Sequence, residues 1–256
     1  MGSPKQTNTG IVIQARMGAE RLPGKILKPL AGAYPVLEWV VERSRRAVKA
    51  QEIIVATTLQ PGDDIVETFC RDHEVRCFRG SEANVFERYY ACAQKFQLDA
   101  VVRVTADCPF ISPETIDRCI DVFWDSKADY VNNSRLRKTY PRGLDVEVVS
   151  FEALKRLADK ALTPSEREHV TLYIYQHPEE FRIQTVEAEP ALCAPELRLT
   201  LDTPDDFQLL NTVAEYFSKE SFHAGSRQIV DYLRKHPDVA DLNRHIEQKK
   251  IDGKII

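Results

Sequence analysis

Three basic residues follow a short apolar segment near the N-terminus, at a spacing that places three positive charges in one loop. The segment reads IVIQARMGAERLPGK, from Ile11 to Lys25. Its β-branched start is typical of a buried strand, and the glycines and proline that follow keep the backbone irregular. Arg16, Arg21 and Lys25 would project from this loop, where positive charge and exposed N–H groups suit a triphosphate. A basic surface loop is the alternative, because neither GxxxxGK[ST] nor GxGxxG is present.

Two apolar runs further along the chain each end at an aspartate. VVRVTAD ends at Asp107, and LRLTLD ends at Asp202. A hard divalent cation such as Mg²⁺ prefers one or two carboxylates together with phosphate oxygens and water. Two aspartates at neighbouring strand ends, opposite the basic loop, would therefore complete a metal–triphosphate site. Asp202 has a second interpretation as a helix cap or turn residue, since Thr203 and Pro204 follow it.

The segment between these aspartates carries charged residues that do not suit a core strand. We interpret residues 132–196 as the side of the site that binds a second substrate, the acceptor of the transferred group. Within YPRGLDVEV, alternation places Asp145 and Glu147 on one strand face. The pair would bind acceptor hydroxyls or deprotonate a nucleophile, or it would protect an exposed edge strand from aggregation. The residues leave both interpretations open.

A helix start at Thr163 and Pro164 places His169 in the first turns of a short helix, as an acceptor contact or as a structural histidine. An acceptor with a phosphate or phosphonate group would meet Arg142, Arg167 and His169. A neutral sugar hydroxyl would not need these cations.

Apolar strand-like runs alternate with helix-like segments, a pattern typical of a mostly parallel sheet covered by helices. In such sheets ligands bind beyond the carboxyl ends of the strands, where the basic loop emerges. A C-terminal stretch from Gln228 has helix-spaced apolar positions and predicts one or two packing helices. The expected strands are Ile11–Gln14, Ile53–Thr57, Val75–Phe78, Ala100–Val104, Asp129–Asn132 and Leu197–Leu201, and the expected helices lie around 36–49, 63–73, 84–97 and 113–126.

The 256 residues, 43% of them hydrophobic, are enough for one domain with a sizeable core. A formal charge of −4 argues against a nucleic-acid or anionic-membrane binder. The sequence shows neither a membrane-spanning apolar stretch nor a signal peptide, so we expect a cytoplasmic protein. The six cysteines lack metal-ligand spacing, so we expect reduced thiols, with Cys108 packing beside Asp107 rather than acting as a nucleophile.

Six motifs occur in order along the chain: QARMGAERLPGK, FRGSEANVFERYY, RVTADCPFI, YPRGLDVEV, REHVTLYIYQHPEEF and LRLTLDTPDDF. Together they resemble the cytidylyltransferase superfamily, in the branch named after spore coat polysaccharide biosynthesis protein F. A more distant resemblance, mainly in the first loop and the two aspartate motifs, is to the enzymes that activate 3-deoxy-octulosonate and acylneuraminate. The match runs from Thr9 to about residue 249. Glu20 departs from the branch, where threonine is frequent, and we expect it to point outward.

The resemblance implies a GT-A-like nucleotidyltransferase fold, with a Rossmann-like, mostly parallel mixed sheet and helices on both faces. It implies transfer of CMP from CTP to a small-molecule acceptor, with Mg²⁺, release of pyrophosphate, and a homodimer. The acceptor would be a sugar acid or a molecule bearing phosphate or phosphonate. One domain would span 9–249, with an acceptor and dimer insertion at about 132–196, C-terminal helices at 225–249 and flexible tails at 1–8 and 250–256.

The same resemblance implies roles for individual residues. Arg16, Lys25 and Asp107 would be catalytic, and Asp107 and Asp202 would hold the metal. From the charged residues of the 132–196 segment, we expect the acceptor to meet Arg142, Asp145, Glu147, Glu168 and His169. The nucleotide would contact Ala15, Arg16, Met17, Gly18, Arg21, Lys25, Thr57, Ser81, Asn84, Thr105 and Ala106.

Two alternatives of other classes remain. A GT-A-type glycosyltransferase using a nucleotide sugar would require a DxD-type metal motif, whereas this chain has Asp107-Cys108-Pro109. A catalytically silent nucleotide-binding subunit would bind CTP or CMP without releasing pyrophosphate, which the intact Lys25 and Asp107 disfavour.

Overall fold

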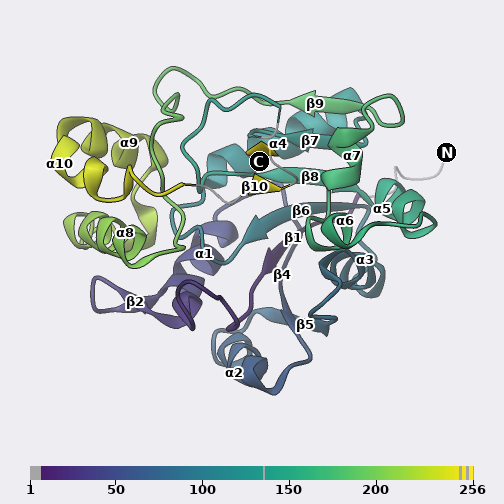
Figure 1. Ribbon diagram of the computed structural model, residues 1–256, viewed down its shortest axis with the longest axis horizontal. Coiled ribbons are helices and arrows are strands. Elements are labelled where there is room, and N and C mark those ends of the chain that lie inside the picture. The colour runs from purple at the N-terminus through teal and green to yellow at the C-terminus, as the bar shows by residue number, and fades with distance from the viewer. Residues whose placement is uncertain (1–6, 135, 248–249, 252–253, 256) are drawn as a thin grey trace.

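A seven-stranded mixed sheet forms the centre of the molecule (Figure 1). The computed structural model describes residues 7–134, 136–247, 250–251 and 254–255. The strand order is β5-β4-β1-β6-β8-β7-β9, and β8 alone in this sheet runs antiparallel to its neighbours. The strands are β1 (Thr9–Gln14), β4 (Glu52–Thr58), β5 (Arg76–Gly80), β6 (Ala100–Thr105), β7 (Tyr130–Asn132), β8 (Glu147–Ser150) and β9 (Ile183–Thr185).

The central strands are apolar on both faces because helices cover both faces. In β1, the side chains of Ile11, Val12 and Ile13 are fully buried, and alternate residues join the cores on opposite sides. One face carries α1 (Val36–Arg45), α2 (Asp64–Asp72) and α4 (Pro113–Ser126), and the other carries α3 (Val85–Lys95), α5 (Phe151–Ala158) and α7 (Leu172–Gln176). The expected helix-covered, mostly parallel sheet is confirmed.

The C-terminal helices form a separate layer beside the sheet, at the yellow end of the colour scale in Figure 1. They are α8 (Pro204–Tyr216), α9 (Ser226–Lys235) and α10 (Pro237–Ala240). The expected strand at Leu197–Leu201 is wrong. Its three leucines are buried in the core of this C-terminal layer, and the segment forms an isolated β-bridge between Arg198 and Arg142 instead of a strand ladder.

Capping side chains begin three of the helices that contain a proline in their first turn. Ser112 Oγ accepts a hydrogen bond from Thr115 N at 3.1 Å, and Thr203 Oγ1 accepts one from Asp206 N at 3.2 Å. Thr163 forms a capping box at the short helix α6 (Pro164–Glu168). His169 therefore follows α6 instead of lying within its first turns.

Short strand pairs complete the fold. They are β2 (Pro29–Leu30) with β3 (Tyr34–Pro35), and β10 (Lys250–Ile251) with β11 (Lys254–Ile255). Most of the tails predicted at 1–8 and 250–256 lies outside the described residues, although Asn8 is tied to Asp99 by a 2.8 Å hydrogen bond. Within the part of the chain that the structure describes, no helix is both long and apolar enough to cross a membrane.

Candidate active site

A cavity of about 440 Å³ opens at the carboxyl ends of the parallel strands. Gln14 at the end of β1 and Thr105 at the end of β6 line it. Because β8 runs in the opposite direction, its first residue, Glu147, lies at the same edge, in register with Arg103. The cavity thus receives residues from the ends of two strands and the start of a third.

One ammonium group joins the basic loop to the two aspartates. Lys25 Nζ donates to Asp107 Oδ2 at 2.7 Å, to Asp202 Oδ1 at 2.9 Å and to the Leu201 carbonyl oxygen at 2.6 Å. Arg21 Nη2 contacts the other oxygen of Asp202, Oδ2, at 3.0 Å. The aspartates predicted from two separate motifs therefore share a single cation.

The charges in this cluster shift one another's ionisation. Burial alone would lower the pKa of the Lys25 ammonium, but Asp107 and Asp202 outweigh it and the pKa is raised. Burial would likewise raise the pKa of the Asp107 carboxyl, and Lys25 holds it below its usual value instead. At neutral pH Lys25 is charged and Asp107 is ionised.

Asp202 is held in place by a pair that sequence reasoning missed. Arg198 Nη2 donates to Asp202 Oδ2 at 2.7 Å, and Arg198 Nε donates to Asp206 Oδ1 at 2.8 Å. Asp206, which is fully buried, also accepts the backbone N–H of Asp202 at 2.9 Å. Arg198 and Asp206 therefore fix both the side chain and the backbone of Asp202, and the N-cap of α8 is Thr203 and not Asp202.

The donor set at this cluster fits a magnesium ion. Two carboxylate oxygens and one carbonyl oxygen converge on the point where Lys25 Nζ lies. Hard oxygen ligands, with one or two carboxylates among them, are what Mg²⁺ takes in nucleotide sites. Asp107 and Asp202 are thus able to hold the ion.

Glu147 contributes a buried carboxylate to the cavity lining. Glu147 Oε1 pairs with Arg103 Nη1 at 2.9 Å, and Oε2 accepts hydrogen bonds from the hydroxyls of Tyr130, at 3.0 Å, and Thr171. Only 2% of the Glu147 surface is exposed. Glu147 begins β8, which lies between β6 and β7, and Asp145 precedes the strand. The two residues therefore do not share a strand face as expected, and the edge-strand interpretation is excluded.

Asp145 and the predicted acceptor cations line the same cavity. Asp145 Oδ2 accepts a hydrogen bond from the Gly143 N–H at 2.8 Å, and the Asp145 side chain is partly exposed to the cavity. Arg142 and His169 are lining residues, whereas Arg167 is exposed and lies outside the lining. Lys138, which no motif singled out, adds a further cation.

Comparison with known proteins identifies the family. The family model described as cytidylyltransferase matches residues 10–248. The chain belongs to the cytidylyltransferase family. An uncharacterized protein of Methanocaldococcus jannaschii is 36% identical over 238 residues, covering 93% of this chain and 95% of the relative. The spore coat polysaccharide biosynthesis protein SpsF of Bacillus subtilis is 35% identical over 238 residues, covering 90% of this chain and 95% of the relative.

Solved structures agree with this assignment. A cytidylyltransferase from Leptospira borgpetersenii superposes with a TM-score of 0.87 at 31% identity, covering 95% of this chain and all of that chain. A CMP:2-keto-3-deoxy-manno-octonic acid synthetase solved in complex with CTP has a TM-score of 0.60 at 18% identity, over 84% of this chain and all of that chain, and shows the shared fold. The nucleotidyltransferase fold expected for this cytidylyltransferase is confirmed.

The cavity collects twelve of the predicted site residues and leaves six outside its lining. Thr57 is fully buried, and Ser81 and Asn84 hydrogen-bond within the loop that begins α3. Glu20 is exposed and is among the lining residues, and the outward direction of its carboxylate stays a prediction. The lining includes Arg16, Arg21, Lys25, Thr105, Ala106, Asp107, Arg142, Asp145, Glu147, Glu168, His169 and Asp202; Ala15, Met17, Gly18, Thr57, Ser81 and Asn84 are outside it.

Cys108 lines the cavity as a buried thiol. Burial raises the pKa of its thiol, which lies beside the Asp107 carboxylate. A protonated thiol is a poor nucleophile. The expectation that Cys108 packs beside Asp107 is consistent with this geometry.

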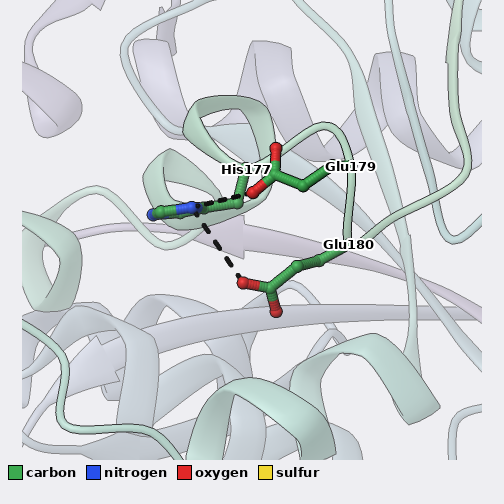
Figure 2. A group of neighbouring side chains, drawn as sticks. All are labelled: His177, Glu179 and Glu180. Atoms are coloured by element: carbon green, nitrogen blue, oxygen red, sulfur yellow. Dashed lines mark hydrogen bonds and ion pairs between the residues drawn. The ribbon is translucent and has the colours of Figure 1, made fainter.

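A group of titratable side chains outside the cavity has the composition of a metal site. His177, Glu179 and Glu180 follow α7, and Figure 2 shows both carboxylates directed toward the imidazole ring. His177 Nδ1 lies 3.3 Å from Glu179 Oε1 and 4.0 Å from Glu180 Oε1. Lys160 Nζ already pairs with Glu180 at 2.8 Å. The group is therefore accounted for as a surface ion-pair cluster.

Gly143 holds two segments of the cavity wall close together. Its φ is +96°, and a Cβ at this position would lie 2.4 Å from the Leu199 carbonyl oxygen. We expect Gly143→Ala to separate 142–145 from 197–200, lower the melting temperature and reduce kcat/KM, because Asp145 lies on the first segment and Asp202 follows the second by two residues. Thermal unfolding and steady-state kinetics test this. Gly62→Ala is the control, since its Cβ would meet nothing within 4 Å; equal effects at both positions would contradict the prediction.

Stability at acid pH should depend on Asp206. Burial would raise the pKa of this carboxyl, but Arg198 outweighs burial and lowers it below the usual 3.8. A depressed carboxyl pKa stabilises the fold above the unfolded value, and the contribution is lost as the pH falls through the folded value. Urea unfolding between pH 7 and pH 3 should show a steeper acid loss in the wild type than in Asp206→Asn. Parallel curves would refute this role.

Proposed function

We propose that this cytidylyltransferase transfers CMP from CTP to a sugar acid, or to a small molecule bearing phosphate or phosphonate, and releases pyrophosphate in a Mg²⁺-dependent step. The observation that carries the proposal is the Lys25 ammonium in contact with both Asp107 and Asp202, at the carboxyl edge of the sheet. The family of the chain and its similarity to a spore coat polysaccharide biosynthesis protein support a role in surface polysaccharide biosynthesis.

The chemistry needs positioning and charge more than a protein nucleophile. An acceptor oxygen attacks the α-phosphorus, and the bond to the departing pyrophosphate breaks. Arg16, Arg21 and Lys25 hold the triphosphate and offset its charge. Asp107 and Asp202 would hold the metal ion, which would stabilise charge developing on the phosphate oxygens.

The acceptor binds to the part of the cavity lining that contains Arg142, Lys138 and His169. These groups suit an anionic acceptor. If the attacking group is a sugar hydroxyl, Asp145 is better placed than Glu147 to take its proton, because both oxygens of Glu147 are already engaged. A phosphate or phosphonate oxygen is already ionised and needs no such base.

The finer points of the assignment remain part of the proposal. They comprise the choice of CTP over other nucleotides, Mg²⁺ as the ion, a homodimer formed through the 132–196 segment, and a cytoplasmic location. Glu20 bears on the first of these, since it is a lining residue in the same loop as Arg16 and Arg21.

Pyrophosphate release is the decisive test. The assay combines the protein, Mg²⁺ and each of CTP, UTP, ATP and GTP with a panel of sugar acids, sugar phosphates, phosphonates and phosphorylated amino acids. We expect release with CTP and one class of anionic acceptor. No release from any nucleotide would favour the silent subunit, and tight binding of a nucleotide sugar would favour the glycosyltransferase.

A further inference from the structure

The ammonium group of Lys25 has no hydrogen-bond donor left for a phosphate. A lysine ammonium has three donors, and Lys25 makes three contacts, to Asp107, Leu201 and Asp202, between 2.6 and 2.9 Å. Its side chain is 11% exposed. To contact a triphosphate, Lys25 must first leave the two carboxylates.

The three oxygens that bind Lys25 are also the ones a metal ion would use. Asp107 Oδ2 and Asp202 Oδ1 point at one position, and the remaining oxygen of each aspartate is engaged elsewhere. Asp107 Oδ1 accepts a hydrogen bond from the Thr105 hydroxyl at 2.6 Å. Asp202 Oδ2 accepts a hydrogen bond from Arg198 Nη2 at 2.7 Å and forms an ion pair with Arg21 Nη2 at 3.0 Å. Two cations cannot share that position, because they would repel each other at contact distance.

We propose that Lys25 is the resident cation of the Asp107–Asp202 pair in the nucleotide-free enzyme, and that it yields this position to the metal only when a nucleoside triphosphate takes up its ammonium group. The inference rests on the proposed function, because it assigns the triphosphate and the metal to this site. It makes Lys25 a positioning residue for the two carboxylates before the substrate arrives, and a triphosphate ligand afterwards.

Exchange of this kind couples metal and nucleotide binding. A triphosphate that draws Lys25 away raises the affinity for the metal, and by thermodynamic linkage the metal raises the affinity for the triphosphate by the same factor. The free enzyme then disfavours metal binding at a carboxylate pair that would otherwise attract it. In the absence of substrate, the Lys25 ammonium also offsets the repulsion between the Asp107 and Asp202 carboxylates.

Arg21 offers a matched comparison. It carries the same charge as Lys25 and contacts the same aspartate, but on the outer oxygen and not between the two carboxylates. Removing Arg21 changes the local potential without opening the shared position. Removing the Lys25 ammonium does both.

The test measures Mn²⁺ binding by electron paramagnetic resonance of the free ion, without nucleotide or acceptor, in the wild type, Lys25→Met and Arg21→Met. We expect Lys25→Met to bind Mn²⁺ at least about 10-fold more tightly than the wild type, within the usual range of coupling between sites. Arg21→Met should gain no more than about threefold, as for a partly exposed ion pair. Equal gains in both variants, or no gain in Lys25→Met, would overturn the proposal.

Folding of the lysine variant is itself informative. Lys25→Met leaves two neighbouring carboxylates without their shared partner, so its melting temperature should be lowered without metal and raised by Mn²⁺ more than that of the wild type. If the variant folds only with Mn²⁺, the exchange is supported; if saturating Mn²⁺ does not restore its circular dichroism, the exchange is refuted. Because these assays contain no CTP, their failure is distinct from absence of pyrophosphate release by the wild type.

Discussion

Asp107→Asn and Asp202→Asn should each lower kcat by about 10³-fold, at the upper end of what loss of one preorganised electrostatic contact costs. Either change removes a charged ligand from the pair that we assign to the metal, and leaves Lys25 with one anionic partner instead of two. The amide has nearly the shape of the carboxylate, so the fold should persist. Pyrophosphate release at saturating CTP and Mg²⁺ gives kcat, and circular dichroism reports the fold.

Asp205→Asn is the control for this experiment. Asp205 lies three residues after Asp202, in the first turn of α8, and its carboxylate pairs with His245 at 3.0 Å, away from Lys25. We expect its kcat to match that of the wild type. Unfolding of Asp202→Asn would indicate a structural role for Asp202. Full activity in both Asp107→Asn and Asp202→Asn would refute the metal-site assignment.

Glu147→Met should reduce the free energy of unfolding by about 3–5 kcal/mol, the usual cost of removing one partner from a buried ion pair. The Arg103 side chain is 12% exposed and would lose its carboxylate, while the Tyr130 and Thr171 hydroxyls would lose their acceptor. Urea unfolding measures the change.

Glu147→Gln separates a structural role from an acceptor role. The amide keeps one oxygen to accept hydrogen bonds, so its stability loss should be smaller than that of Glu147→Met. If Glu147 is structural, kcat/KM for the acceptor should stay near the wild-type value in the folded Glu147→Gln variant. A loss below about 1 kcal/mol in Glu147→Met would show that the network contributes no more than a surface ion pair.

The strands with continuous β-branched runs were predictable because burial on both faces leaves a strong signal in the sequence. Ile11–Gln14, Ile53–Thr57 and Ala100–Val104 all fall within strands of the sheet. Leu197–Leu201 alternates like a half-buried strand, yet its leucines pack against α8 and α9. Local alternation does not reveal whether the apolar face meets a sheet or a helix layer, so this segment was misassigned.

Site residues were predictable where their charge and spacing formed a motif, and were missed where their role depends on a contact made in the folded structure. Charge and spacing pointed to Lys25, Asp107 and Asp202. Arg198 and Asp206 both lie within the motif LRLTLDTPDDF. Their contacts with Asp202 depend on how the chain turns into the first turn of α8, which the motif alone does not show. The burial of Glu147 likewise depends on β8 entering the middle of the sheet, a long-range pairing that periodicity does not encode.

The reversed direction of β8 has an evolutionary consequence. The residues that we assign to the triphosphate lie mainly before 108, and those that we assign to the acceptor lie between 132 and 196; the two groups meet along the β6–β8 pairing. Selection can therefore alter the acceptor half while the nucleotide half is inherited unchanged. Descendants with new acceptors should diverge between 132 and 196, provided that positions such as Arg103 and Glu147, which join the halves, change together.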